Sequence, residues 1–170
     1  MPGADETPLA AGPVISRVGE NDWRVWRDVR LAALADSPTA FGSGSAQEEA
    51  LSENDWRAMT RTAAILVATA GETSVGVVAG LPRQAAGERG LGAMWVARAW
   101  RGSGVAAALT GAVIAWARSD GGTRIGLWVA ADSPRARRFY QRQGFRATGQ
   151  TRPFPNDATR IIGEMVLELD

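Results

Sequence analysis

The segment from Gly90 to Arg118 joins a β-type apolar run to a long apolar helix through a glycine-rich turn. The run reads GLGAMWVAR, and the turn holds RGSG at residues 101–104. A strand, a glycine turn and a helix N-terminus together present unpaired backbone amides and the positive end of the helix dipole to a phosphate. Glycine suits such a turn because a ligand oxygen can then approach the backbone where a Cβ would stand. The segment predicts a fold that mixes strands and helices, with an anion site at the turn.

Apolar patterns predict further strands and helices on both sides of this unit. Asn21 is predicted as the N-cap of the first helix, and residues 39–52 are predicted to be irregular. Strands are predicted at 13–18, 63–70, 74–81, 90–98, 123–130, 145–150 and 161–169, and helices at 22–34, 53–61, 105–118 and from Ser133 to just before Gly144. This order indicates an α+β layer fold in a single domain, residues 13–170, after a flexible tail, residues 1–12.

Three residue types that serve much of enzyme chemistry are missing, since the sequence contains no histidine, cysteine or lysine. Disulfides, thiolate nucleophiles, Ser-His-Asp triads, Schiff bases, a P-loop and nearly all zinc sites are therefore excluded. Catalysis would rely on carboxylates, hydroxyls, backbone amides or the single phenol, Tyr140. The formal net charge of +1 gives no pull toward nucleic acid or membrane. No apolar run reaches the roughly 18 residues of a bilayer span, so a cytoplasmic protein is expected.

One interpretation of the turn is a dinucleotide site. Gly102-x-Gly104-x-x-Ala107 satisfies the Gly-x-Gly-x-x-Gly/Ala fingerprint, and Asp132 lies near the end of the next strand, where a ribose-binding acid would be needed. A dinucleotide fold usually starts with this unit and then adds several βα repeats. Here most of the chain precedes the turn, which argues against this interpretation.

A second interpretation takes the turn and the last helix together. Arg101-x-x-Gly104-x-Ala106, followed by Ser-x-x-Ala-x-x-x-Tyr-x-x-x-Gly-Phe from Ser133 onward, resembles the GNAT superfamily of N-acetyltransferases. The order of elements from Val14 to Leu169 is also similar to that of the family. The resemblance implies a GNAT-like fold, with a mostly antiparallel sheet of about seven strands flanked by about four helices. It also implies acetyl-CoA as co-substrate, with no metal.

The resemblance assigns the coenzyme-binding residues. Main-chain groups of Met94, Trp95 and Val96 would line the pantetheine arm. The phosphates would be held by six residues of the turn and the helix start: Arg101, Gly102, Ser103, Gly104, Val105 and Ala106. Ser133 stands where the family often has asparagine, and it is either a coenzyme contact or an ordinary N-cap. The arginines at 135, 138 and 142 share one face of the last helix and would meet the adenosine phosphates or remain solvated, and Arg137 and Arg138 are the two singled out.

By the same resemblance, Tyr140 is the candidate general acid. When an amine attacks the thioester, the leaving thiolate, with a pKa of about 8.5 if it behaves like cysteine, can take the proton of a phenol of pKa about 10. The difference of about 1.5 pKa units between the phenol and the thiol corresponds to about 2 kcal/mol. The competing interpretation is that Tyr140 only packs, together with Phe139, against the sheet. For the general base, Glu88 is the nearest carboxylate to a position used in some family members, but its AAGERG context indicates an exposed hairpin and it is left unassigned.

The expected reaction is acetyl transfer to a primary amine of a small molecule or a peptide. The acceptor side would be built from the early helices and the late strands, and these regions supply Trp23, Trp26, Phe41, Trp56, Trp95, Trp128 and Phe154 together with Glu48 and Glu49. Aromatic rings with carboxylates would suit a cation, although most of the tryptophans are expected in the core. The alternatives are a non-catalytic acyl-CoA sensor and a toxin-like enzyme of aminoacyl-tRNA, the latter disfavoured by the near-neutral charge. A homodimer is compatible with the family.

Overall fold

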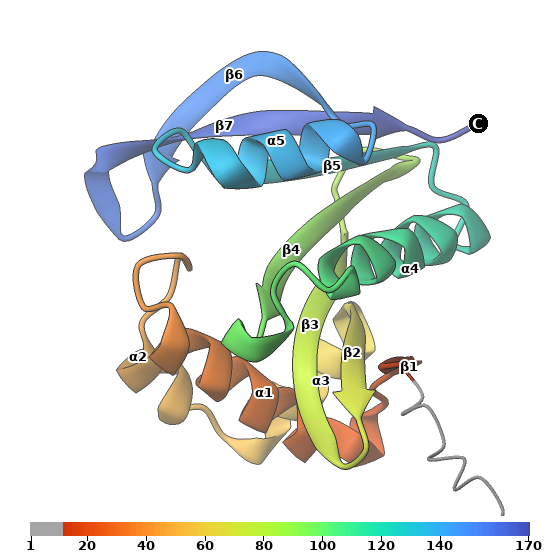
Figure 1. Ribbon diagram of the computed structural model, residues 1–170, viewed down its shortest axis with the longest axis vertical. Helices are drawn as coiled ribbons and strands as arrows, with labels where there is room; N and C mark the ends of the chain where they lie inside the picture. The colour runs from red at the N-terminus through yellow and green to blue at the C-terminus, as the bar shows by residue number, and fades with distance from the viewer. Residues whose placement is uncertain (1–11) are drawn as a thin grey trace, which may run out of the picture.

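The computed structural model describes residues 12–170, which form one seven-stranded sheet with helices on its two faces (Figure 1). The strands are β1 Val14–Arg17, β2 Ala64–Ala70, β3 Thr73–Pro82, β4 Glu88–Val96, β5 Arg124–Ala130, β6 Arg146–Phe154 and β7 Asp157–Glu168. The α-helices are α1 Trp23–Asp36, α2 Ser45–Glu49, α3 Glu53–Thr62, α4 Val105–Ser119 and α5 Pro134–Arg142. The strand order is β1-β2-β3-β4-β5-β7-β6, and every neighbouring pair is antiparallel except β4 and β5. The predicted α+β class and mostly antiparallel sheet are confirmed, and the predicted tail lies outside the described residues apart from Gly12.

Two local predictions were wrong. Asn21 does not cap α1, because a 3-10 turn over Glu20–Asp22 precedes the helix and Asp22 occupies its N-cap without a side-chain hydrogen bond. The segment predicted to be irregular contains the short helix α2, which makes five α-helices in the described chain where four were expected. A helix of five residues is too short to show a periodic apolar pattern.

The sheet separates two hydrophobic clusters. On one face, α4 and α5 pack against the middle and late strands, and Leu109, Val113 and Phe145 are almost fully buried there. On the other face, α1 and α3 cover β2–β4 through Trp26 and Trp56, whose rings meet edge to face with centroids 6.0 Å apart. The predicted hairpin between β2 and β3 and the glycine stop of α4 are both present, the latter through the Gly122 amide bonded to the Ala117 carbonyl.

The two halves of the sheet meet at a short parallel junction. The ladder between β4 and β5 pairs only Glu88–Gly90 with Arg124–Gly126, so the strands separate beyond these residues. In Figure 1, β4 runs with the lower part of the molecule and β5 with the upper part. A register shift in the β3–β4 ladder lies opposite Val78, and Ala93 at this bulge has a φ of 54°. A bulge leaves an extra residue of β4 without a ladder partner.

Candidate functional site

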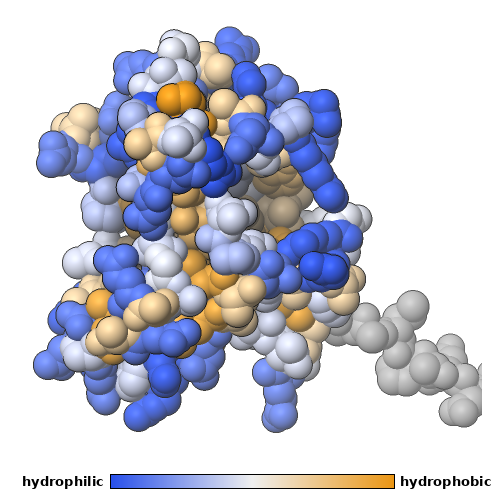
Figure 2. All heavy atoms as spheres, turned by 90° about the vertical axis from the view of Figure 1, so that its left-hand side faces the viewer, coloured by the Kyte–Doolittle hydropathy of each residue, from blue (hydrophilic) through white to orange (hydrophobic). Residues whose placement is uncertain are grey.

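A cavity of about 1070 Å³ occupies the space where β4 and β5 diverge. Its walls include Met94 and Val96 of β4 and Leu127 and Val129 of β5, together with residues of the α1–α2 loop and of α5. Figure 2 shows this side of the molecule hollowed between its upper and lower parts, with hydrophobic residues inside the hollow and hydrophilic residues around it. The cavity therefore joins an apolar floor to a charged rim.

The glycine turn lies at one end of this cavity. Gly102 and Gly104 adopt φ values of 77° and 91°, a region that side chains rarely enter, and a Cβ at either position would point into open space. Gly104 is the N-cap of α4 and supplies no side-chain cap, so the first amides of the helix are left for another acceptor. Ala106 and Ala107 of that first turn line the cavity. An anion at this end would meet the backbone amides and the positive helix dipole together.

Three of the predicted coenzyme residues keep their side chains away from the cavity. Trp95 is buried beneath α1 and donates its indole N–H to Asp36 over 3.0 Å. Val105 belongs to the core under α4, and the Ser103 hydroxyl donates back to the Trp100 carbonyl. These side chains are therefore not available to a ligand, and the Ser103 amide also donates to the Trp100 carbonyl, over 3.3 Å. Trp95 was predicted to act through main-chain groups, so its buried side chain agrees with that prediction.

Arg101 lines the cavity, yet its guanidinium is bonded to the protein. The Nε atom donates to the Val96 carbonyl over 3.0 Å, and Nη2 donates to the Asp36 carboxylate. Hydrogen bonds from Trp95 and Ser37, together with that from Arg101, hold the pKa of the Asp36 carboxyl below its ordinary value. Arg101 thus ties the turn to the end of α1, a partner that no local sequence signal indicated.

Tyr140 lies on the wall of the cavity with its ring in the core. The ring makes edge-to-face contacts with Phe139 and Phe145 at centroid distances of 5.0 and 5.7 Å. The phenol makes no hydrogen bond to another described residue, and burial raises its pKa well above the ordinary value near 10. The phenol is therefore protonated throughout the neutral pH range and available to a ligand.

The start of α5 lines the cavity beside the phenol. Ser133 is the N-cap of α5 and makes no side-chain capping bond, so its hydroxyl is open to a ligand. Among the arginines of this helix, Arg135 and Arg142 line the cavity. Arg137 and Arg138, the two singled out from sequence, are exposed and lie outside the lining. Helical spacing places positions 135 and 142 on one face, but which face meets the cavity depends on how α5 packs.

The aromatic residues predicted for the acceptor side divide into two groups. Trp23, Trp26, Trp56 and Trp95 are buried in the core under α1 and α3. Phe41, Trp128 and Phe154 line the cavity. Glu48 is buried and bonded to Arg30, whereas Glu49 is exposed. The part of the cavity that these three aromatic side chains bound, from the α1–α2 loop, β5 and β6, is the expected acceptor end.

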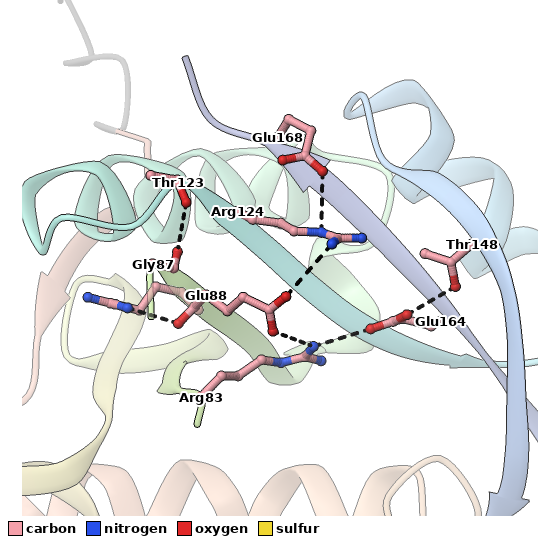
Figure 3. Close-up of polar contacts among 9 residues, drawn as sticks. Arg83, Gly87, Glu88, Thr123, Arg124, Thr148, Glu164 and Glu168 are labelled. Carbon is pink, nitrogen blue, oxygen red and sulfur yellow. Dashed lines mark hydrogen bonds and ion pairs between the residues drawn. The ribbon is translucent and has the colours of Figure 1, made fainter. Parts of the chain in front are cut away.

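Glu88 lies at the junction of β4 and β5, outside the cavity lining. Figure 3 shows its carboxylate pointing toward Arg83 and Arg124, at 4.0 and 3.7 Å. Arg83 also contacts Glu164 over 3.2 Å, and the second oxygen of Glu164 accepts from Thr148 over 3.0 Å. These ion pairs and the Thr148 hydrogen bond link β4, β5, β6 and β7. Glu88 therefore has a structural role that explains its position without catalysis.

Within residues 12–170, no helix has the length and apolar character needed to cross a membrane. The same residues contain no cluster of three or more carboxylates that could hold a metal ion.

Comparison with known proteins identifies the family. Residues 28–145 match the family described as Acetyltransferase (GNAT) family, and this match includes the glycine turn, the cavity walls and Tyr140. The chain belongs to the GNAT acetyltransferase family. This GNAT protein is accordingly an acetyl-CoA-dependent N-acetyltransferase, with acetyl-CoA as its co-substrate. No curated protein matches the sequence significantly.

Solved structures share the GNAT fold with this chain. An acetyltransferase of the GNAT family from Streptococcus pneumoniae matches with a TM-score of 0.77 and 17% identity, covering 93% of this chain and 99% of its own. The putative acetyltransferase yncA from Salmonella typhimurium, solved with its cofactor acetyl-CoA, matches with a TM-score of 0.73 and 17% identity, covering 94% and 95%. A ribosomal-protein-alanine N-acetyltransferase from Brucella melitensis matches with a TM-score of 0.69 and 20% identity, covering 92% and 99%. At such identities the likeness concerns the fold.

Proposed function

We propose that this GNAT protein transfers the acetyl group of acetyl-CoA to a primary amine of a small molecule or peptide, by direct attack in a ternary complex. The observation that carries the proposal is that one cavity is lined by the uncapped start of α4, by Tyr140 and by three aromatic side chains of the expected acceptor side. Such a cavity can hold the coenzyme phosphates at one end and an acceptor at the other, with the thioester between them.

Main-chain groups would hold acetyl-CoA at the coenzyme end of the cavity. The pyrophosphate would accept hydrogen bonds from amides of residues 102–106 other than that of Ser103, which already donates to the Trp100 carbonyl over 3.3 Å. Two positive-φ glycines keep side chains out of the way there. The pantetheine arm would run along Met94 and Val96, and the bulge at Ala93 leaves a backbone group of β4 free for the acetyl carbonyl. Ser133 would donate or accept a hydrogen bond near the same arm.

The chemical step needs an acid for the leaving thiolate, whereas its need for a base depends on the pKa of the acceptor amine. The amine nitrogen bonds to the acetyl carbon, the C–S bond breaks, and the leaving thiolate takes the proton of the Tyr140 phenol. The nitrogen loses a proton to water, and the phenolate regains one from solvent. Burial raises the pKa of Tyr140. The same shortage of water raises the pKa of the thiol that leaves inside the cavity, so the difference between the two pKa values grows by less than the rise at Tyr140.

The proposal is tested by thiol release from acetyl-CoA with a panel of amines that includes amino acids, polyamines, aminoglycosides and short peptides. The protein contains no cysteine, so a thiol-reactive dye reports coenzyme A alone. Release with one class of amine supports the proposal and defines the acceptor. Tight binding of acetyl-CoA without release from any amine would instead favour the sensor alternative, and salt-sensitive binding of RNA would favour the tRNA alternative.

A further inference from the structure

Three guanidinium groups stack on the three aromatic rings at the acceptor end of the cavity. Arg30 lies over Phe41 with its Cζ atom 4.6 Å from the ring centroid. Arg160 lies over Phe154 at 4.5 Å, and Arg152 lies over Trp128 at 4.1 Å. All six residues line the cavity. Because each ring already carries an arginine of the chain itself, these rings are not open to a cationic acceptor.

Two of these arginines are neutralised. Arg30 is almost fully buried and donates to both oxygens of Glu48, over 2.9 and 2.8 Å. Arg160 donates to both oxygens of Asp132, over 2.9 and 3.1 Å. Each is a bidentate arginine–carboxylate pair, and such a pair contributes no net charge to the cavity. These two pairs therefore line the site without offering a free cation to a ligand.

Arg152 differs, because no carboxylate of the described chain pairs with it. Glu164, the ladder partner of Trp128, is already bonded to Arg83 and Thr148 (Figure 3). Asp132, in the turn after β5, is bonded to Arg160. Arg152 is an exposed residue on the wall of the cavity, so its charge is accessible to a ligand that enters from solvent. Stacking on Trp128 also holds the planar group in place, so less side-chain freedom is lost when it binds a carboxylate.

We propose that Arg152 binds a carboxylate of the acceptor, so that the amine acetylated by this protein belongs to an amino acid or a similar small amino-carboxylate. The inference rests on the proposed acetyl transfer and specifies its acceptor. The carboxylate lies against the guanidinium on Trp128, and the amine points toward the thioester beside Tyr140. An internal peptide segment or a polyamine offers no such group next to its amine, so both are poor acceptors.

The test compares kcat/KM for matched acceptors that differ only at the carboxylate: amino acids, the corresponding amino acid amides and the decarboxylated amines. Phenylalanine, phenylalaninamide and phenethylamine form one such series, and the remaining amino acids supply others. Amidation lowers the pKa of the amine and so increases the fraction of neutral amine that can attack. This effect favours the amides, so a measured preference for the free acids cannot be explained by the amine pKa. We expect the free acid to be preferred by about tenfold to a hundredfold, mainly through KM.

Two variants assign that preference to Arg152. Arg152→Gln is expected to remove the preference by lowering kcat/KM for the acids far more than for the amides, and Arg152→Lys to keep part of it. The control is Arg146→Gln, which changes an exposed arginine on the same strand outside the cavity lining and should leave the preference intact. Equal use of acids and amides by the wild-type protein, or an equal loss for both in Arg152→Gln, would overturn the inference.

A binding measurement separates this inference from the proposed function. Calorimetric titration of N-acetylphenylalanine and its amide into the protein saturated with coenzyme A requires no turnover. Binding of the acid by wild-type protein and its loss in Arg152→Gln support the carboxylate site even if no amine is acetylated. If the protein acetylates amines that lack a carboxylate but does not bind the acid, the proposed acetyl transfer is supported and the carboxylate site is contradicted.

Discussion

The guanidinium of Arg101 and the carboxylate of Asp36 are bonded across 65 residues of chain, and the Trp95 indole donates to the same carboxylate oxygen. Asp36 is the last residue of α1, whereas Arg101 opens the glycine turn at the start of α4. The bond therefore ties the helix that borders the acceptor end to the turn that would hold the coenzyme phosphates. A bond of this kind positions the turn without contacting the ligand.

Asp36→Asn should weaken acetyl-CoA binding several-fold, because the amide still accepts from Trp95 but holds the Arg101 guanidinium less strongly than a carboxylate does. Calorimetric titration of acetyl-CoA measures this loss. Asp28→Asn changes an exposed carboxylate on the same helix and serves as the control. Equal coenzyme affinity in both variants would show that the Arg101 bond does not position the turn.

Gly104→Val should abolish acetyl-CoA binding, because the new side chain enters the space where the pyrophosphate is proposed to lie. The φ of 91° is also strained for valine, at a cost of about 1–2 kcal/mol in the free energy of unfolding. Gly149→Val provides a matched control, since Gly149 has a φ of 86°, has open space around it and lies outside the cavity. We expect both variants to lose the same amount of stability and only Gly104→Val to lose coenzyme binding. Unchanged acetyl-CoA affinity in Gly104→Val would contradict the assignment of the turn to the phosphates.

Tyr140→Phe should lower kcat by about 10²–10⁴-fold while leaving acetyl-CoA affinity unchanged, as expected for the loss of a general acid. The phenylalanine ring can keep the contacts with Phe139 and Phe145, and the phenol makes no hydrogen bond within the described chain. Thermal unfolding should therefore shift little. A variant with full turnover would leave Tyr140 as a packing residue.

The single tyrosine makes its ionisation directly measurable in the folded protein. Burial raises the pKa of Tyr140, so tyrosinate absorbance should appear only well above pH 10 in the native state and near pH 10 in denaturant. Because the folded pKa is the higher one, the stability linked to Tyr140 is fully present below pH 10 and falls as the pH rises beyond it. Tyr140→Phe is the blank for the titration. Native tyrosinate near pH 10 would mean that the ring is not buried.

Glu48→Gln should lower the free energy of unfolding by about 3–5 kcal/mol, because it leaves the buried Arg30 guanidinium without its carboxylate. Burial raises the pKa of Glu48, but hydrogen bonds from Arg30 and Ser43 outweigh it and the pKa is lowered overall. Urea unfolding measures the loss, and Glu49→Gln, at the exposed next position, should cost almost nothing. Similar losses in both variants would contradict a buried ion pair.

Most of the fold could be predicted because its signals are local. The β2–β3 hairpin, the glycine stop of α4 and the strand, turn and helix around Gly104 each depend on residues close in sequence. Errors arose where a segment lacks periodicity, as in α2, or where a turn preceded a helix, as at Asn21. The positions of Gly104 and Tyr140 on one cavity follow from two motifs whose order and spacing resemble those of the family.

The class of fold, the phosphate-type turn, the candidate phenol and the absence of histidine, cysteine and lysine chemistry could be inferred from the residues alone. The folded chain was needed to establish where β4 and β5 part, which arginine each carboxylate neutralises and that Arg152 on Trp128 has no carboxylate partner among the described residues. These outcomes join residues far apart in the chain, such as Arg160 and Thr39, which are bonded across 121 residues. Local patterns set the elements, but the packing of those elements sets which side chains meet, and charge pairing in the cavity depends on that packing.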